Sequence, residues 1–179
     1  LSEYLLAKLN VLRNHTEEDS FLAPAALLSE ANGPARTKSI ENLDYVREDG
    51  IFFPSTNASR ISDLSAFRLP GLHNRANLNC ALFALDEYAR RKGIVVNPGR
   101  LSELIRSFKG LPHRMEIAGE KDGILFINDS KATTVQAVLS GLTAFAGRKV
   151  ALLAGGYDKG LVYTELGGKA DVLLPFGQA

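Results

Sequence analysis

The sequence has one cysteine, three histidines and no long apolar run, and these shortages exclude several kinds of protein. The single thiol, Cys80, cannot form an internal disulfide, and the histidines are too scattered to join it at zinc-ligand spacing. Its apolar neighbours indicate a buried structural thiol rather than a nucleophile. No apolar stretch approaches the roughly 18 residues of a membrane-spanning helix, and the first residues lack the basic segment and cleavage site of a secretory signal. We therefore expect a cytoplasmic protein.

Positive and negative charges nearly balance, because the sequence has 21 Lys and Arg residues and 20 Asp and Glu residues. No run of five like charges occurs, so the sequence predicts neither a nucleic-acid-binding face nor an acidic tail. We expect a monomer with no nucleic-acid and no membrane partner. The 179 residues, 45% of them hydrophobic, suffice for one compact domain or two small ones.

The first 110 residues contain three segments with helical periodicity. Leucines at helical spacing predict a helix over residues 2–14 that includes Lys8. A second helix is predicted to begin near Asn74, which can cap it, and to end at Gly93. A third follows Asn97 and ends at Gly110. Residues 19–69 give weaker signals, which indicate short strands and loops.

The pattern changes from helical to alternating near residue 110, which predicts a domain boundary between 1–110 and 111–179. An Asp-Gly turn at residues 122–123 predicts a hairpin. Residues 124–127 and 150–153 then read as buried strands on either side of a helix over 134–145. This order predicts a βαβ unit with parallel strands, and hence an α/β fold class.

The loops after these two strands carry the polar residues that point to a binding site. Parallel strands bring such loops to one edge of a sheet, where ligands of open α/β folds bind. The following helix can be capped by Asp129, Ser130 or Thr133, and its N-terminus attracts anions. Lys131 and Lys159 add positive charge to these loops. The loops therefore predict a phosphate or carboxylate site. The alternative, that the polar residues only cap the helix and the lysines are solvated, stays open.

The pair Asn74 and Asn77 and the residue Lys8 each have an ordinary structural interpretation beside a functional one. Asn74 and Asn77 share a helix face, and their amides could either cap the helix or bind the donor and acceptor edge of a nucleobase. Lys8 lies among leucines, where a lysine usually extends its ammonium group to water.

Five segments in a fixed order carry a resemblance to a known family. The sequence is similar to the D-glutamate-adding branch of the Mur ligase family in the following segments: Tyr4-Leu5-Leu6-Ala7-Lys8-Leu9, Gly71-Leu72-His73-Asn74-Arg75-Ala76-Asn77, Phe108-Lys109-Gly110-Leu111-Pro112-His113-Arg114, Asn128-Asp129-Ser130-Lys131-Ala132-Thr133 and Gly155-Gly156-Tyr157-Asp158-Lys159-Gly160. The segment 128–133 is the most discriminating, because sister ligases carry other residues there. The resemblance implies that residues 1–110 are the later part of a P-loop-type central ATPase domain. By the same resemblance, residues 111–179 are the start of a Rossmann-like C-terminal domain.

The resemblance also implies an activity. Such ligases use ATP and Mg²⁺ to activate the carboxylate of UDP-N-acetylmuramoyl-L-alanine as an acyl phosphate, which the amine of D-glutamate attacks in peptidoglycan precursor synthesis. Positively charged groups and the metal then neutralise the developing phosphate charge. The chain is expected to be an incomplete ligase that is inactive alone.

Residue roles follow by position from the same resemblance. For nucleotide binding, Asn74 and Asn77 would hold the adenine of ATP, and Arg114 and Asp129 would contact its ribose and phosphate region. For catalysis and substrate binding, Lys131 would lie by the reacting groups, Thr133 and Lys159 would bind a D-glutamate carboxylate, and Lys8 would be carbamylated to hold a magnesium ion. Carbamylation suits that role because it converts a cation into an anionic oxygen ligand.

Several departures from the family pattern limit what these residues can do alone. No Gly-x-x-x-x-Gly-Lys-Ser/Thr phosphate loop occurs in the 179 residues. Thr134 stands where the family usually has Asn, Val162 where it has an acidic residue, and the stretch 166–171 is short. A non-catalytic nucleotide- or anion-binding module is therefore the main alternative. A folylpolyglutamate-synthase-type ligase is a third, against which the segment 128–133 argues.

Overall fold

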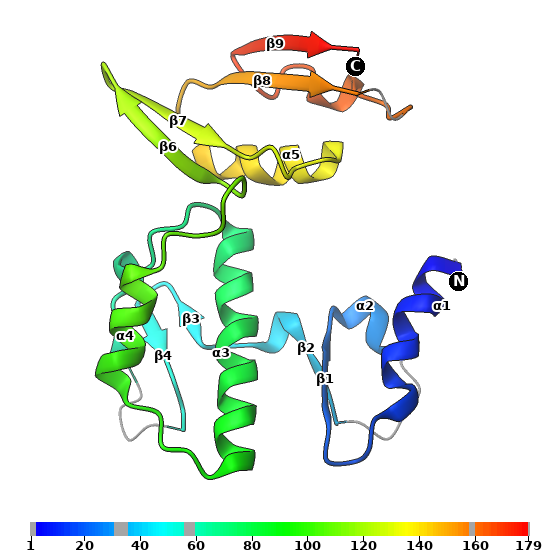
Figure 1. Ribbon diagram of the computed structural model, residues 1–179, viewed down its shortest axis with the longest axis vertical. Coiled ribbons are helices and arrows are strands. Elements are labelled where there is room, and N and C mark those ends of the chain that lie inside the picture. The colour runs from blue at the N-terminus through cyan, green and yellow to red at the C-terminus, as the bar shows by residue number, and fades with distance from the viewer. Residues whose placement is uncertain (1–2, 31–35, 56–59, 158–159, 179) are drawn as a thin grey trace. The chain divides into compact units, whose positions relative to one another are not determined.

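A computed structural model describes residues 3–30, 36–55, 60–157 and 160–178 of the chain (Figure 1). The chain divides into two units. One contains residues 1–67 and 76–106, and the other contains residues 68–75 and 107–179. Both units mix helices and strands, so the expected α/β class is confirmed in this general form.

The first unit begins with a short helix and a parallel strand pair. Its elements are α1 (Glu3–Leu9), the 3-10 turn η1 (Asn10–Asn14), β1 (Ser20–Ala23), α2 (Ala25–Leu28), β2 (Arg36–Ser39) and η2 (Ile40–Asn42). Strand β1 pairs with β2 in parallel, from Ser20 opposite Arg36 to Ala23 opposite Ser39. The helix predicted over residues 2–14 is thus confirmed as α1 followed by a tighter turn.

A small antiparallel sheet and two long helices form the core of this unit. The elements are β3 (Val46–Arg47), β4 (Gly50–Phe52), β5 (Arg60–Ser62), η3 (Leu64–Ala66), α3 (Leu72–Lys92) and α4 (Pro98–Ser107). The buried core consists of Leu43, Tyr45, Ile51, Phe53, Leu82, Phe83, Leu101 and Ile105. Ile51 and Phe53 are fully buried, and each buried side chain of this size stabilises the fold by about 1.5–3 kcal/mol.

The two long helices begin in different ways. Helix α4 follows the prediction, because the Oδ1 atom of Asn97 accepts a hydrogen bond of 2.9 Å from the backbone N–H of Arg100 and Pro98 is the first helical residue. Helix α3 begins at Leu72, two residues before the predicted cap. Asn74 does not cap it, since its Nδ2 atom donates to the carbonyl of Pro70 at 2.6 Å instead.

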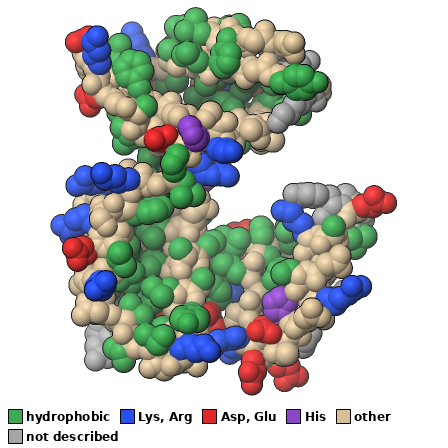
Figure 2. Space-filling view, in the orientation of Figure 1, with side chains coloured by type: hydrophobic (Ala, Val, Ile, Leu, Met, Phe, Trp, Pro, Cys, Tyr) green, Lys and Arg blue, Asp and Glu red, His purple; other side chains and the backbone are tan. Residues whose placement is uncertain are grey.

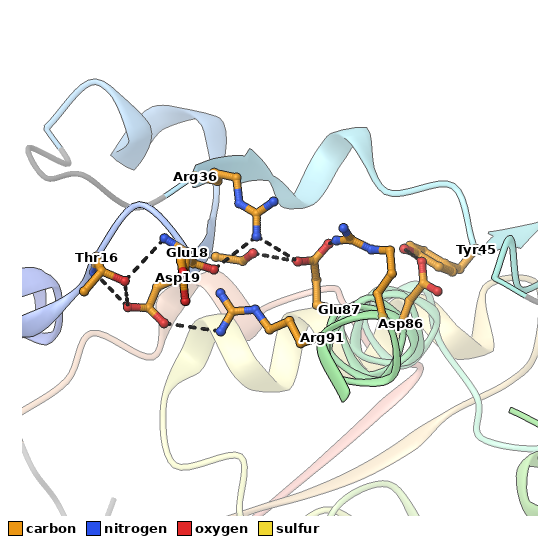
Figure 3. A network of polar contacts seen from close by, with 10 residues as sticks. Thr16, Glu18, Asp19, Arg36, Tyr45, Asp86, Glu87 and Arg91 are labelled. Carbon is orange, nitrogen blue, oxygen red and sulfur yellow. Dashed lines mark hydrogen bonds and ion pairs between the residues drawn. The ribbon is translucent and has the colours of Figure 1, made fainter. Parts of the chain in front are cut away.

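A network of charged side chains ties β1 and β2 to the second half of α3 (Figure 3). The carboxylate of Glu87 accepts from the hydroxyl of Ser20 at 2.8 Å, pairs with Arg90, and lies 3.9 Å from the guanidinium of Arg36. Arg91 pairs with Asp19 at 3.4 Å. Burial alone would raise the pKa of Glu87, but the Ser20 hydroxyl and the arginines outweigh it and lower that pKa.

The second unit opens with the predicted hairpin. Strands β6 (Glu116–Lys121) and β7 (Ile124–Asn128) pair antiparallel, from Lys121 opposite Ile124 at the turn to Glu116 opposite Asn128 at the open end. Asp122 and Gly123 have φ angles of 53° and 76°, the left-handed pair that a type I′ turn requires. The Asp-Gly signal is therefore confirmed.

The rest of the second unit contains α5 (Val135–Leu142), η4 (Thr143–Phe145), β8 (Ala151–Gly156), η5 (Thr164–Leu166) and β9 (Val172–Gly177). The strand–helix–strand order is as predicted, but β7 and β8 lie in separate sheets, so the prediction that they are parallel strands of one sheet is wrong. Strand β8 pairs in parallel with β9 instead. Gly155 permits this pairing, because a Cβ atom there would lie 1.8 Å from the carbonyl oxygen of Phe176.

The second unit exposes much of its apolar surface. Hydrophobic side chains show at the surface of this unit in Figure 2. The exposed large hydrophobic residues on its strands are Ile117, Ile124, Phe126, Leu153, Val172, Leu173, Leu174 and Phe176. The buried apolar residues of this unit that the structure describes include Met115 and Leu166.

In the described part of the chain, no helix is long and apolar enough to cross a membrane.

Candidate functional site

Two loops of the second unit are held together by backbone and side-chain hydrogen bonds. The N–H of Lys131 donates to the carbonyl of His113 at 3.1 Å, and the N–H of Met115 donates to the Oδ1 atom of Asp129 at 3.0 Å. These bonds join the loop before β6 to the loop after β7. They bring together three residues that the sequence analysis singled out, namely Arg114, Asp129 and Lys131.

The two cations of this site are available to a ligand. Arg114 and Lys131 are both exposed. Their side chains make no hydrogen bond or ion pair with the residues that the structure describes. The two nearby carboxylates bind backbone groups instead of these cations. The Oε2 atom of Glu116 accepts from the N–H of His113 at 2.9 Å, and the Oδ1 atom of Asp129 accepts from the N–H of Met115. The loop therefore presents positive charge suited to a phosphate or carboxylate.

Asp129 has a structural contact that the sequence did not reveal. Its carboxylate is half-buried, and a Cβ atom added to Gly141 of α5 would lie 3.2 Å from its Oδ2 atom. The residue thus packs against α5 while holding the loop before β6. One carboxylate oxygen of Asp129 accepts from the N–H of Met115.

The cap of α5 differs from the expectation. Thr134, and not Asp129, Ser130 or Thr133, is the N-cap, because its hydroxyl accepts from the N–H of Ala137 at 3.2 Å. A capping side chain must precede the first helical residue directly, and α5 begins at Val135. The side chain of Thr133 makes no hydrogen bond to the described residues, so its hydroxyl is not committed to the helix.

The loops after β7 and β8 line one cavity of about 1380 Å³ in this unit. Its walls include Asp129 and Thr133 from the loop after β7, Tyr157 from the loop after β8, and Gly155 from the end of β8 itself. The sequence analysis expected the loops after β7 and β8 at one edge of a single sheet. Their strands belong to different sheets, but both loops line this cavity. Lys159 lies outside the described residues.

The two asparagines predicted to bind a nucleobase lie in the first turns of α3. Asn74 is half-buried and uses one N–H of its amide on Pro70, which leaves its Oδ1 atom and second N–H. Asn77 is exposed, and its side chain has no hydrogen bond to the residues that are described. Both side chains retain donor and acceptor capacity.

Lys8 occupies the last turn of α1 and is exposed. Among the described residues, no group of three His, Cys, Asp or Glu side chains is placed to hold a metal ion. A magnesium site does not follow from these residues, since a carbamylated Lys8 would supply only one ligand. Cys80 is half-buried, and its burial raises the pKa of the thiol, in line with the structural role predicted for it.

The sequence analysis did not single out three residues that the structure places at the site. His113, Glu116 and Asn128 form a cluster around the two loops. His113 and Asn128 were quoted only as parts of longer segments, and the pairing of Glu116 with Asn128 at the open end of the hairpin is the signal that joins them.

No protein-family model matches the chain, but several individual proteins named as ligases are similar to it. The chain is 31% identical over 168 residues to the UDP-N-acetylmuramoylalanine--D-glutamate ligase of Aquifex aeolicus, across 93% of the chain and 38% of the relative. It is 34% identical over 173 residues to that of Geobacillus kaustophilus, across 91% of the chain and 36% of the relative. A UDP-N-acetylmuramoyl-L-alanine--L-glutamate ligase of Xanthomonas oryzae pv. oryzae is 43% identical over 101 residues, 56% of the chain and 20% of the relative.

The chain is therefore a homologue of the Mur ligases. In particular, it resembles the D-glutamate ligases over about nine tenths of its own length, while it spans little more than a third of theirs.

Proposed function

We propose that these residues belong to an ATP-dependent ligase that joins D-glutamate to UDP-N-acetylmuramoyl-L-alanine in peptidoglycan precursor synthesis. The observation that carries the proposal is the hydrogen bonding between the loops before β6 and after β7, which gathers Arg114, Asp129 and Lys131. The similarity to ligases of this name over most of the chain supports it. We further propose a cytoplasmic, monomeric protein whose domains divide near residue 110.

Each residue receives a role that matches its chemistry. The cations of Arg114 and Lys131 would neutralise phosphate oxygens, and Asp129 would accept a hydrogen bond from a ribose hydroxyl. Asn74 and Asn77 would bind the adenine edge through their remaining donors and acceptors. When bound, ATP supplies the phosphoryl group that activates the muramoyl-alanine carboxylate, and the amine of D-glutamate then displaces phosphate.

The remaining roles concern the amino acid and the metal. The exposed hydroxyl of Thr133 and the ammonium of Lys159 would bind a D-glutamate carboxylate. Lys8, if carbamylated, would give Mg²⁺ an anionic oxygen ligand.

A second candidate is a nucleotide- or anion-binding module without catalysis. The absence of a Gly-x-x-x-x-Gly-Lys-Ser/Thr loop from the 179 residues favours it for this chain taken alone. The configuration of the amino acid is a separate question, because a relative named for L-glutamate is 43% identical over part of the chain.

The test measures phosphate release by this chain and by the full-length gene product. Each reaction contains ATP, Mg²⁺, UDP-N-acetylmuramoyl-L-alanine and either D- or L-glutamate, with each substrate omitted in turn. We expect turnover by the full-length product that requires all substrates and prefers D-glutamate. A preference for L-glutamate would keep the ligase and change the substrate. Nucleotide binding without turnover would favour the binding module.

A further inference from the structure

The side chain of Asn128 bridges the two loops of the candidate site. Its Nδ2 atom lies 2.9 Å from the Nδ1 atom of His113 and donates to the Oε2 atom of Glu116 at 3.3 Å. Its Oδ1 atom accepts from the N–H of Ser130 at 3.2 Å. Because the amide nitrogen can only donate, the Nδ1 atom of His113 acts as acceptor and the ring proton lies on Nε2.

Glu116 holds the same histidine through its backbone. The Oε2 atom of Glu116 accepts from the N–H of His113 at 2.9 Å as well as from Asn128. Asn128 therefore fixes the ring of His113, and Glu116 fixes its main chain. Both residues stand at the open end of the β6–β7 hairpin, where they face each other across the two strands.

The residue held in this way has an unfavourable backbone conformation. His113 has φ 64° and Met115 has φ 48°, so Arg114 lies between two left-handed residues that are not glycine. Such a conformation costs about 1–2 kcal/mol per residue and persists only where surrounding contacts hold it. Those contacts are the bonds from Glu116 and Asn128 to His113 and from Met115 to Asp129. A strained, well-anchored backbone thus presents the exposed Arg114.

We propose that Asn128 and Glu116 are positioning residues for nucleotide binding, which hold His113 so that Arg114 is presented to the ribose and phosphate region of ATP. They act through Arg114 and touch no ligand themselves. The proposal rests on the proposed ligase function.

The test is a double-mutant cycle in the full-length gene product. Asn128→Leu removes the bridge at similar volume and should raise KM for ATP about tenfold, the factor expected for roughly 1.4 kcal/mol of lost binding. KM for UDP-N-acetylmuramoyl-L-alanine should stay within about twofold. If Asn128 acts through Arg114, the double variant with Arg114→Ala should bind ATP no worse than Arg114→Ala alone.

Glu116→Leu, compared with Glu120→Leu on the same strand, provides a matched pair. Only the first should raise KM for ATP, because the exposed Glu120 makes no contact with His113. Thermal unfolding of each variant separates a folding defect from a binding defect. Asn128→Asp keeps the acceptor for Ser130 but loses both donors, so it should behave like Asn128→Leu.

A spectroscopic readout is independent of activity. In the 179-residue chain, ¹⁵N imidazole shifts should show His113 protonated at Nε2 and not at Nδ1, and Asn128→Leu should shift the tautomer ratio toward that of a free histidine, with some Nδ1–H present. Additive losses in the cycle, or an unchanged KM for ATP in Asn128→Leu, would overturn the proposal while leaving the ligase function intact. No turnover by the wild-type full-length product would instead remove the ligase function and this proposal with it.

Discussion

The phenolic hydroxyl of Tyr45 donates a hydrogen bond of 2.9 Å to the buried carboxylate of Asp86, between the segment before β3 and the middle of α3 (Figure 3). Ser55 donates to the same carboxylate. Nearer the N-terminus of α3, the Oδ1 atom of Asn79 accepts from the N–H groups of Tyr45 and Val46, each at 2.9 Å. Tyr45 is therefore attached to α3 at both ends, which fixes the helix against the small sheet.

This pair predicts a dependence of stability on alkaline pH. Burial, together with the hydrogen bond and charge of Asp86, raises the pKa of Tyr45 above its ordinary value of 10. The stability it contributes is fully present below about pH 10 and is lost as pH rises through the folded pKa, because the unfolded phenol ionises first. Urea unfolding of the 179-residue chain between pH 8 and about 11 should show this loss.

The matched variant is Tyr45→Phe. It should lower the free energy of unfolding at pH 8 by about 1–2 kcal/mol, since Asp86 loses a partner while the ring stays buried. Its stability should also fall less steeply above pH 10 than that of the wild type. Equal slopes would mean that Tyr45 ionises as easily in the folded chain as in the unfolded one.

Acid should weaken the first unit through Glu87. Its folded pKa is lowered, so its contribution is present above its ordinary value of 4.5 and is lost as pH falls through the folded pKa. The contribution should be about 1 kcal/mol or less, because the arginines around it are half-exposed. Glu87→Gln should make the free energy of unfolding depend less steeply on pH between about pH 5 and 3. Glu103→Gln, on the surface of α4, should leave that slope unchanged.

The threonine pair at the start of α5 separates stability from binding. Thr134→Ala removes the N-cap and should destabilise the chain by about 1 kcal/mol. Thr133→Ala, at an exposed position, should change stability by less than about 0.5 kcal/mol. If the proposed role is right, Thr133→Ala should raise KM for D-glutamate in the full-length gene product and leave KM for ATP unchanged. Thermal melts and initial rates measure the two effects, and a matching stability loss in both variants would speak against the assignment of the cap.

Gly155 should not tolerate a side chain. Gly155→Ala would place a Cβ atom 1.8 Å from the carbonyl oxygen of Phe176, so β8 and β9 would have to separate at this point. We expect a loss of about 2 kcal/mol or more, with faster hydrogen exchange along β9. The comparison variant is Gly99→Ala in α4, where a Cβ atom meets only Asn97 Oδ1 at 3.4 Å and helix propensity predicts a gain of about 0.5–1 kcal/mol. Unchanged exchange in Gly155→Ala would contradict the pairing.

Local signals in the sequence predicted local structure well. The Asn97-Pro98 start of α4 and the Asp122-Gly123 turn were both predicted, because each depends on neighbouring residues alone. The partner of β8 was not, since pairing with β9 depends on contacts some 20 residues away that periodicity does not encode.

For the candidate site, the sequence named residues within local segments but did not predict the contacts between those segments. Arg114, Asp129 and Lys131 were named from their segments, and the structure brings them together. The bond from Met115 to Asp129 and the cluster of His113 with Asn128 require left-handed backbone at non-glycine residues, which no composition rule predicts. The roles of Arg114, Asp129 and Lys131, like those of Lys8, Asn74, Asn77, Thr133 and Lys159, stay predictions.

The antiparallel pairing of Glu116 with Asn128 has a consequence for how the chain folds. The two lie only 12 positions apart in the sequence, so closing the hairpin costs little loop entropy and brings the two loops of the site together in one step. Contacts between residues close in sequence form quickly, on the microsecond scale for a hairpin. This part of the site can therefore assemble early in folding, before β8 and β9 find each other.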